Sequence, residues 1–349
     1  MKISACLIVK NEAEMLAKTL PTISKCLDEI VIVDTGSTDQ TIEVAKQFGA
    51  KVSSFKWIND YSAARNESLR QATGDWVFWV DADEFLQEAD LQKLREIIEA
   101  SKQTAYILPI YESKLGTCEQ KSGYDRVKVF KNHLGYHFIR VINEQVVDQA
   151  GKIVSGEKVS IPIYHWGLDL AKEKMEQKRT RYLALYSAAL AQQPDDPYLH
   201  LLLANNYSEL KKYDQAIKHY GQAYELAPQS EIGIKGLEKK ASLHFRLKDF
   251  SKAAQASDTL LKIDPENTQA LLIAASFYLF AGKIDESIET SQKILARKIN
   301  DKVANLYQTR GMPKMLLGKA YKIKGEPDKA NVCFAQAREI CPEIFGGNN

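Results

Sequence analysis

The first half of the chain alternates short apolar runs with segments of helical spacing. The runs at residues 3–9, 29–33 and 76–80 are rich in β-branched or aromatic residues and predict strands. Residues 38–48 and 61–72 lie between these runs and predict helices. This β-α-β rhythm predicts a largely parallel α/β sheet, in which ligands bind at the carboxyl ends of the strands.

The second half alternates alanine-rich helical stretches with short turns, and similar residues recur about every 34 positions. The recurring order of small, aromatic, alanine and proline positions is typical of tetratricopeptide repeats, which stack into a superhelix with a concave face. It is most complete at Ala204, Tyr207, Ala216, Tyr220, Ala223 and Pro228, and again at Gly318, Tyr321, Ala330, Phe334, Ala337 and Pro342. The alternative, an irregular helical bundle, does not explain why several positions recur in register.

The two patterns predict two domains. All four tryptophans lie in the first half, and the composition changes near residues 168–172. We therefore predict an α/β domain over residues 1–169 and an all-α repeat domain over residues 170–349. Within the second domain, we expect a half repeat at about 170–196 and repeats at about 197–230, 234–267, 268–301 and 311–344.

Composition narrows the class of protein. With 47 Lys and Arg against 45 Asp and Glu, the formal charge of +2 provides no basic excess for binding nucleic acid. The five cysteines form neither a close metal-ligand pair nor an even disulfide framework, which predicts a reduced, cytoplasmic protein. The short apolar start before Lys10 predicts no export signal. The longest apolar segment, 270–281, is shorter than the roughly 18 residues of a membrane-spanning helix.

Asp81 and Asp83 are the first candidates for chemistry. Two carboxylates on a turn directly after an apolar strand can hold a divalent cation that neutralises a substrate diphosphate. An Asp-x-Asp triplet by itself is common in solvated loops and helix caps. Its place directly after the run at 76–80 favours the cation site, because unpaired charges beside a core strand are costly.

Asp34 ends another predicted strand, and Gly36 allows a turn into the helix that follows. We expect the side chain of Ser37, Thr38 or Asp39 to cap that helix. Asp34 is also a candidate contact for the base or ribose of a nucleotide, and the two roles are compatible.

Four motifs stand in one order along the first domain. They are Ile8-Val9-Lys10-Asn11-Glu12, Val33-Asp34-Thr35-Gly36-Ser37-Thr38-Asp39, Ala63-Ala64-Arg65-Asn66 and Asp81-Ala82-Asp83-Glu84. Their combination resembles glycosyltransferase family 2, which has the GT-A fold, over roughly residues 1–170. The resemblance implies contacts with a nucleotide-sugar donor at Val9, Asn11, Glu12, Asp34, Arg65, Asn66 and Asp81. It also implies that Asp81 and Asp83 bind Mn²⁺ or Mg²⁺. The alternative for Arg65 is a charge on the surface of a helix.

Members of this family displace the nucleoside diphosphate from the sugar in one step, which inverts the configuration at the reacting sugar carbon. They therefore need a base that deprotonates the acceptor. Glu144, in Val141-Ile142-Asn143-Glu144-Gln145, resembles the glutamate of a His-Glu-Gln stretch in bacterial relatives, although Asn143 replaces the histidine. One alternative is that Glu144 is a solvated strand residue. The other is that Glu84 is the base, although its position favours a supporting role beside the metal pair.

A late histidine is a third metal ligand in many GT-A enzymes, and His165 in Tyr164-His165-Trp166-Gly167 fits that place. The alternative, to which we give equal weight, is that His165 is a packed histidine in the core. Arg126 lies in an alternating run that predicts a strand over 124–130, where a structural role is favoured over contact with substrate.

The sequence thus predicts a metal-dependent enzyme that transfers a sugar from a nucleoside-diphosphate sugar, which we expect to be UDP-linked. A family 2 domain joined to helical repeats resembles the peptide glycosyltransferases of glycosylated bacteriocins, and equally the enzymes of envelope polysaccharide synthesis. A concave repeat surface favours a polypeptide acceptor. An inert interaction scaffold would have lost a metal carboxylate or the base, and a sugar nucleotidyltransferase would need a glycine-rich basic loop in place of Lys10-Asn11-Glu12. An oligomer is compatible with the sequence.

Overall fold

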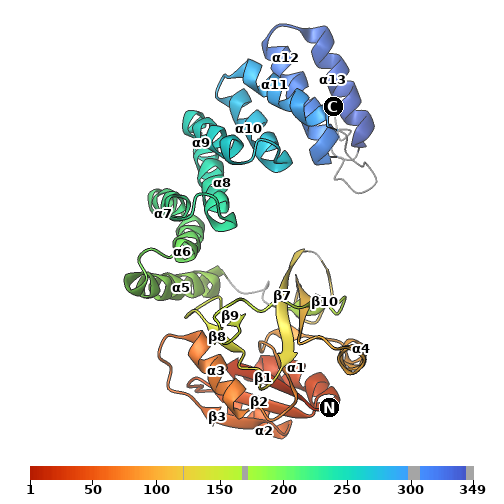
Figure 1. The fold of residues 1–349 in the computed structure, drawn as a ribbon, viewed down its shortest axis with the longest axis vertical. Helices are drawn as coiled ribbons and strands as arrows, with labels where there is room; N and C mark the ends of the chain where they lie inside the picture. Colours follow the sequence, from red (N-terminus) through yellow and green to blue (C-terminus); the bar gives the residue numbers. More distant parts are fainter. Residues whose placement is uncertain (121, 167–171, 298–306, 343–349) are drawn as a thin grey trace. The chain divides into compact units, whose positions relative to one another are not determined.

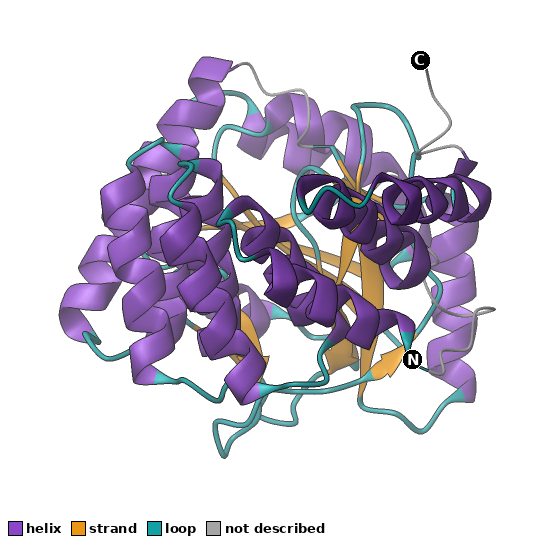
Figure 2. Ribbon diagram, turned by 90° about the horizontal axis from the view of Figure 1, so that it is seen from above, coloured by secondary structure: helices purple, strands orange, loops and turns teal. Residues whose placement is uncertain are grey.

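The computed structural model describes residues 1–120, 122–166, 172–297 and 307–342. The chain forms two compact units, Met1–Lys178 and Arg179–Asn349. Helix α5 (Lys172–Gln192) contains the division between them, whereas the predicted boundary between residues 169 and 170 lies outside the described residues. All the described strands, which are orange in Figure 2, belong to the first unit (Figure 1). None of the described helices combines the length and apolar character needed to cross a membrane.

A sheet of nine strands forms the centre of the first unit (Figure 1). The strands of this unit are β1 (Ile3–Val9), β2 (Glu29–Asp34), β3 (Lys51–Ser54), β4 (Trp76–Trp79), β5 (Glu84–Phe85), β6 (Ala105–Glu112), β7 (Ser122–Lys131), β8 (His137–Ile139), β9 (Gln145–Val147), β10 (Glu157–Lys158) and β11 (Ile163–His165). The order in the sheet is β3-β2-β1-β4-β7-β6-β11-β5, with β10 paired to β6. Strand β7 is antiparallel to β4 and β6, β5 is antiparallel to β11, and the other pairs in this sheet are parallel. Strands β8 and β9 form a separate antiparallel pair.

The strands of the sheet carry apolar residues on both sides, so each face is packed against other elements of the unit. The helices before α5 are α1 (Ala13–Cys26), α2 (Thr41–Gln47), α3 (Tyr61–Gln71) and α4 (Glu88–Ala100). Leu20 of α1 and Leu94 of α4 belong to the core on one face, together with Leu7 of β1. Trp79 of β4 belongs to the core on the other face, together with Phe138 of β8. The predicted α/β fold with a mostly parallel sheet is confirmed.

Of the three side chains predicted to cap the second helix, Asp39 bonds to the first residue of that helix, whereas Ser37 and Thr38 bond elsewhere. Helix α2 begins at Thr41, and the residue before it, Gln40, makes no side-chain cap hydrogen bond. Ser37 and Thr38 bond instead to the turn after β1, as described below. Asp39 accepts hydrogen bonds from the backbone N–H groups of both Ala13 and Thr41, the first residues of α1 and α2. Asp39 therefore joins the starts of α1 and α2, because its two carboxylate oxygens each accept from one helix.

The second unit consists of helices that pack in sequence order, each against the next (Figure 1). They are α6 (Pro197–Glu209), α7 (Tyr213–Leu226), α8 (Glu231–Arg246), α9 (Phe250–Ile263), α10 (Thr268–Phe280), α11 (Ile284–Leu295), α12 (Met312–Ile323) and α13 (Pro327–Ile340), with a π-helical turn, η1 (Tyr307–Gly311), before α12. Parts of the predicted repeats at 268–301 and 311–344 lie outside the described residues. The stacked helical pairs confirm the tetratricopeptide repeats.

Small residues in the repeats allow the helices to approach closely. Ala204, Ala216 and Ala223 of the first pair are fully buried, with no exposed surface. At Gly318, an added Cβ atom would lie 2.5 Å from a ring carbon of Phe334 on the next helix. The recurring small positions thus mark helix contacts, which is why they repeat with the period of the structural unit.

Two histidines of the first repeat pair are in direct contact. Nδ1 of His200 and Nδ1 of His219 lie 2.9 Å apart, and Nε2 of His200 lies 3.0 Å from the carbonyl oxygen of Pro194. Because a carbonyl only accepts, Nε2 of His200 carries the hydrogen and its Nδ1 accepts from His219. Burial, followed by His200 and Lys218, lowers the pKa of His219 to about 4.

We expect His219 to make folding sensitive to acid. The folded state favours the neutral imidazole, so its contribution is fully present above the ordinary pKa of about 6.5 and is lost as pH falls toward 4. Thermal unfolding should be compared for the unmodified chain and His219→Gln between pH 7 and 4. Between pH 7 and pH 4, the difference in free energy of unfolding between the two proteins should narrow by on the order of 1 kcal/mol. This figure allows for solvent screening of a partly exposed group. If the stabilities of the two proteins changed in parallel with pH, this role of His219 would be contradicted.

Candidate active site

The predicted site residues follow strands that end at one edge of the sheet. Strands β1, β2 and β4 are parallel neighbours, and β6 and β11 run in the same direction because β7 is antiparallel to both β4 and β6. Asn11, Asp34 and Asp81 lie at or just beyond the ends of β1, β2 and β4. Glu112 and His165 end β6 and β11. This edge therefore gathers polar side chains where an α/β sheet binds ligands.

The turns after β1 and β2 form one hydrogen-bonded unit. Asn11 Oδ1 accepts from the N–H of Thr38 at 2.7 Å, and Ser37 Oγ accepts from the N–H of Asn11 at 2.9 Å. The N–H of Glu12 donates to Oγ1 of Thr41 at 2.8 Å. Asn11 has a φ of 57°, in the left-handed region that asparagine tolerates. The predicted donor contacts Asn11 and Glu12 thus belong to a loop that is already ordered.

Val9 and Asp34 are buried at the base of this loop. The carbonyl oxygen of Val9 accepts from the N–H and the hydroxyl of Thr35, and its side chain belongs to the sheet core. Oδ2 of Asp34 accepts from the N–H groups of Gly36 and Ser37, each at 3.1 Å. Gly36 has a φ of 105°, which side-chain-bearing residues rarely adopt. Asp34 therefore closes the turn, and its contact with a nucleotide stays a prediction.

We expect Asp34→Ala to raise the KM for the sugar donor about tenfold, because it removes a predicted nucleotide contact and the acceptor that closes the turn. Asp34→Asn is the matched control, since its amide oxygen can still accept from Gly36 and Ser37. A smaller rise in KM is expected for this variant. Steady-state kinetics at saturating acceptor measure both, and an unchanged KM in Asp34→Ala would leave Asp34 as a turn residue only.

The backbone of the turn at residues 81–84 is held on several sides. The N–H of Glu84 donates to the carbonyl oxygen of Asp81 at 3.1 Å, and Oε2 of Glu84 accepts from the N–H of Asp81 at 2.9 Å. The carbonyl oxygens of the two residues between them accept from Thr19 Oγ1 at 3.1 Å and from the N–H of Trp166 at 2.8 Å. The turn therefore presents its two aspartates from a fixed backbone.

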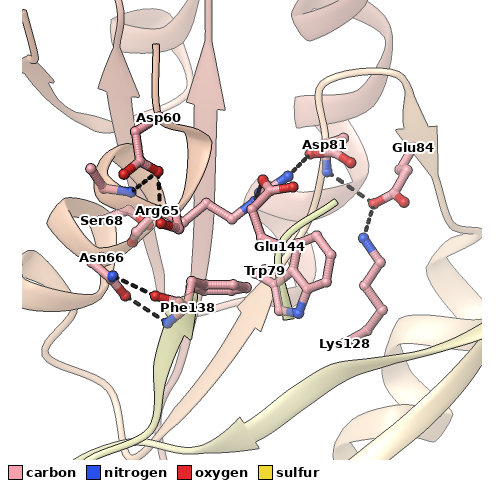
Figure 3. A network of polar contacts seen from close by, with 12 residues as sticks. Asp60, Arg65, Asn66, Ser68, Trp79, Asp81, Glu84, Lys128, Phe138 and Glu144 are labelled. Carbon is pink, nitrogen blue, oxygen red and sulfur yellow. Dashed lines mark hydrogen bonds and ion pairs between the residues drawn. The ribbon is translucent and has the colours of Figure 1, made fainter. Parts of the chain in front are cut away.

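Arg65 joins two predicted functional carboxylates (Figure 3). Its Nη2 donates to Oδ1 of Asp81 at 2.6 Å, and its Nε donates to Oε1 of Glu144 at 2.7 Å. Burial raises the pKa of Asp81, but the guanidinium outweighs it and holds this pKa below its ordinary value. The guanidinium carbon lies 4.4 Å from the ring centroid of Trp79. Arg65 is only 5% exposed, so it is not a surface charge.

A second buried ion pair lies beside Trp79. In Figure 3, its residues Lys128 and Glu84 are to the right of Trp79, whereas Arg65 enters from the left. Nζ of Lys128 is 2.6 Å from Oε2 of Glu84, and these side chains are 0% and 2% exposed. Burial raises the pKa of Glu84 and lowers the pKa of Lys128. The guanidinium carbon of Arg126 lies 5.7 Å from the Trp79 ring centroid. The two hydrogen bonds at Oε2 of Glu84 support a role in holding the turn.

His165 lies between two carboxylates. Its Nε2 is 3.1 Å from Oδ2 of Asp83, and its Nδ1 is 3.0 Å from Oε2 of Glu112. Burial lowers the pKa of His165, but the two carboxylates, with Asp83 first, outweigh it and raise this pKa to about 9. The imidazole is therefore oriented by charged neighbours at the sheet edge.

The donor chemistry at this edge fits a divalent cation. Carboxylate oxygens and an imidazole nitrogen suit Mn²⁺, and a carboxylate on the second ring nitrogen, as Glu112 provides, commonly orients a metal-binding histidine. Across the described ranges, however, no three His, Cys, Asp or Glu side chains converge as a metal group. The structure brings Asp83 to His165, whereas Asp81 turns to Arg65.

Glu144 is carried by a segment that α3 anchors. The amide of Asn66 makes two hydrogen bonds to the backbone of Phe138, donating to its carbonyl oxygen at 2.9 Å and accepting from its N–H at 2.7 Å (Figure 3). The N–H of Tyr61 donates to the carbonyl oxygen of Val141 at 2.9 Å. Glu144 itself is 8% exposed, so it is not a solvated strand residue. Asn66, a predicted donor contact, thus holds the segment that leads to Glu144.

Three residues of this region were absent from the sequence-based prediction. Glu112 ends the apolar run of β6, which is the same signal that identified Asp34 and Asp81. Lys128 interrupts an apolar run in β7, and a charge in such a place is a usable signal. Thr19 lies within α1 and has no such signal, because only the packing of α1 brings it to the turn at 81–84.

Comparison with known proteins supports both parts of this description. Residues 4–154 match the model of glycosyl transferase family 2. Residues 197–230 match the tetratricopeptide repeat model, and residues 242–275 match that of the Fis1 C-terminal tetratricopeptide repeat.

Two curated relatives and one solved structure are similar to this chain. A tetratricopeptide repeat-containing protein of Synechococcus elongatus is 31% identical over 208 residues, which are 57% of this chain and 50% of that protein. The prophage-derived glycosyltransferase SunS of Bacillus subtilis is 24% identical over 222 residues, which are 62% of this chain and 52% of SunS. The crystal structure of S. aureus TarS aligns with 72% of this chain and 54% of its own, at 16% identity and a TM-score of 0.42. The chain spans about half the length of these curated relatives.

The family 2 match runs from within β1 to beyond β9 and so includes the segments that carry Asn11, Asp34, Asp81 and Glu144. The repeat matches cover the pairs α6–α7 and parts of α8 to α10. The chain therefore contains a glycosyltransferase family 2 domain followed by tetratricopeptide repeats.

Proposed function

We propose that the chain is a metal-dependent, inverting glycosyltransferase that moves a sugar from a nucleoside-diphosphate sugar, most simply a UDP-sugar, to an acceptor. One observation carries the proposal: in a family 2 domain, the guanidinium of Arg65 binds both Glu144 and Asp81 at the edge where strands end. A one-step inversion needs a base on the acceptor side and charge stabilisation on the diphosphate side. Arg65 holds the residues proposed for these two tasks at a fixed spacing.

The nucleotide would bind to the joined turns after β1 and β2. Asn11, Glu12 and Asp34 are the proposed contacts, and hydrogen bonds join these two turns to each other. An ordered loop loses less conformational freedom when it binds, so more of the contact energy remains as affinity.

Asp81, Asp83 and His165 are the proposed ligands of a divalent cation. A bound Mn²⁺ or Mg²⁺ would supply positive charge beside the departing diphosphate. The chain's own residues prepare this place: Glu112 orients the imidazole of His165, and Arg65 holds Asp81.

Glu144 is the proposed general base. It would take the proton from the attacking hydroxyl or thiol of the acceptor as that atom bonds to the sugar carbon. The bond from Arg65 Nε to Oε1 of Glu144 fixes the direction of the carboxylate. Its burial limits competition from water for the sugar.

For the acceptor, we propose a peptide or protein side chain held by the repeats. Stacked helical pairs provide an extended surface that suits a polypeptide. SunS, to which this chain is similar, is itself a glycosyltransferase. A growing envelope polysaccharide is the alternative acceptor, and an inert scaffold is the alternative to catalysis. The predicted base and both metal-pair aspartates are present, which opposes the scaffold.

The first test is equilibrium binding of UDP with and without Mn²⁺, followed by a hydrolysis screen over common sugar nucleotides. We expect Mn²⁺ to strengthen UDP binding and at least one UDP-sugar to be hydrolysed slowly. Failure to bind any nucleoside diphosphate with Mn²⁺ would leave the scaffold as the better explanation.

We expect a chain that ends after Gln192 to keep donor hydrolysis but to lose at least about tenfold in kcat/KM for a peptide acceptor, because the repeats supply the extended contacts. This end point keeps α5 whole. A melting curve must show that the shortened protein is folded. A folded protein with full kcat/KM would recast the repeats as a dock for other proteins.

A further inference from the structure

Strand β7 contains a β-bulge at Lys128. In its pairing with β6, Val129 lies opposite Tyr106 and Val127 lies opposite Ile107, so Lys128 is the extra residue. A bulge redirects a side chain, and bulges are frequent next to active sites. Here it directs a lysine into the interior, where the side chain is fully buried.

The redirected lysine meets an aromatic face and a carboxylate. Its Nζ lies 3.5 Å from the ring centroid of Trp79 and 2.6 Å from Oε2 of Glu84 (Figure 3). The guanidinium of Arg65 contacts the same ring system. Two cations thus share Trp79, and each is paired with carboxylates of the proposed site, so this is an organised arrangement and not a stray buried charge.

The same carboxylate oxygen connects Lys128 to the metal-pair turn. Oε2 of Glu84 accepts from both Nζ of Lys128 and the N–H of Asp81, while the N–H of Glu84 donates to the carbonyl oxygen of Asp81. This reciprocal pair closes the turn from Asp81 to Glu84. A buried glutamate keeps its charge only with a partner, so the position of Glu84 depends on Lys128.

We propose that the buried pair of Lys128 and Glu84 positions the turn at residues 81–84 in the active site, with Glu84 making the direct contact to that turn. Held by the bulge and by Trp79, Lys128 fixes Glu84 so that Glu84 closes the turn and sets the directions of Asp81 and Asp83. The inference rests on the proposed function, because it assigns to this pair the alignment of two carboxylates toward a diphosphate and its cation. If the pair only filled space in the core, the hydrogen bond from Asp81 to Glu84 would have no effect on ligand binding.

Two double variants separate these possibilities. Lys128→Met with Glu84→Gln removes the ion pair but keeps an oxygen that accepts from the N–H of Asp81. Lys128→Met with Glu84→Met removes the ion pair and that acceptor at nearly the same volume. Changing both partners avoids the unpaired buried charge that a single variant would leave.

We expect the dissociation constant for UDP with Mn²⁺ to be about tenfold higher in the Met/Met variant than in the Met/Gln variant, the effect of losing one hydrogen bond. Without Mn²⁺, the two variants should bind UDP alike. Equal affinities with Mn²⁺ in two folded variants would overturn the proposal. Failure of the unmodified protein to bind UDP with Mn²⁺ would instead refute the proposed function, and the inference with it.

Melting curves are the control for folding. If the Met/Met variant does not fold, the unmodified protein and the Met/Gln variant decide the question. A neutral amide makes a weaker bond to the N–H of Asp81 than a carboxylate does, so UDP affinity with Mn²⁺ should fall at least about threefold. An unchanged affinity would overturn the positioning role.

Discussion

Asp83→Asn and Asp81→Asn are each expected to abolish sugar transfer. Each variant replaces a charged oxygen with a neutral amide at the place proposed for the cation. A bound cation contributes several kcal/mol of transition-state stabilisation, so kcat/KM should fall by at least about 10³-fold. Transfer assays with a hydrolysable UDP-sugar and UDP titrations with Mn²⁺ measure the loss of catalysis and of metal-dependent binding separately.

The two positions differ in their effect on folding. The side chain of Asp83 is 31% exposed and contacts His165, so Asp83→Asn is the cleaner variant. Asp81 is bonded to the buried Arg65, so its replacement also weakens a buried charge pair and calls for a melting curve. Asp285→Asn is a matched control, because that side chain is 81% exposed and pairs with Lys324 at the surface. Activity retained in both site variants would remove the proposed metal site.

Glu144→Gln is expected to lower kcat by about 10² to 10⁴-fold, the usual range for a lost general base. The amide oxygen can still accept from Nε of Arg65, so the segment should stay in place. Donor affinity should therefore change little, and the loss should appear in kcat and not in the dissociation constant for UDP.

Glu84→Gln is the matched comparison for Glu144. Its side chain bonds to Lys128 and to the backbone of Asp81, so we expect it to alter metal-dependent donor affinity more than kcat. A large loss of kcat in Glu84→Gln, with Glu144→Gln nearly unaffected, would reverse the assignment of the base.

Local pattern was sufficient for much of the architecture. The run from Ile3 to Val9 has the predicted bounds of β1, because seven residues of apolar or small character lie between polar neighbours. The helical pairs of the second unit follow from small residues that recur with the period of the stacked unit. Asp34 and Asp81 were recognisable because each is an acid at the end of an apolar strand, where sheet ligands bind.

Other features depended on partners that are distant in sequence. The local pattern indicated Ser37, Thr38 or Asp39 as a helix cap. Asp39 does bond to the first residue of α2, but Ser37 and Thr38 bond to Asn11, whose turn the β1–β2 pairing brings beside them. The amide of Asn66 likewise bonds to Phe138, 72 residues further along the chain. Polar side chains bond to whichever partners the fold brings near, so sequence position alone does not identify those partners.

The chain by itself therefore determined where the strands β1, β2, β4 and β7 and the repeat helices form, and that Asp34 and Asp81 follow strands, because these depend on local apolar spacing. Only the tertiary structure decided how those acids are connected. The order of the sheet and the packing of α3 bring Arg65 to both Asp81 and Glu144, and a one-residue register shift in β7 directs Lys128 to Glu84. Such contacts require sheet order, helix packing and strand register together, and none of these is set by the residues within a single segment.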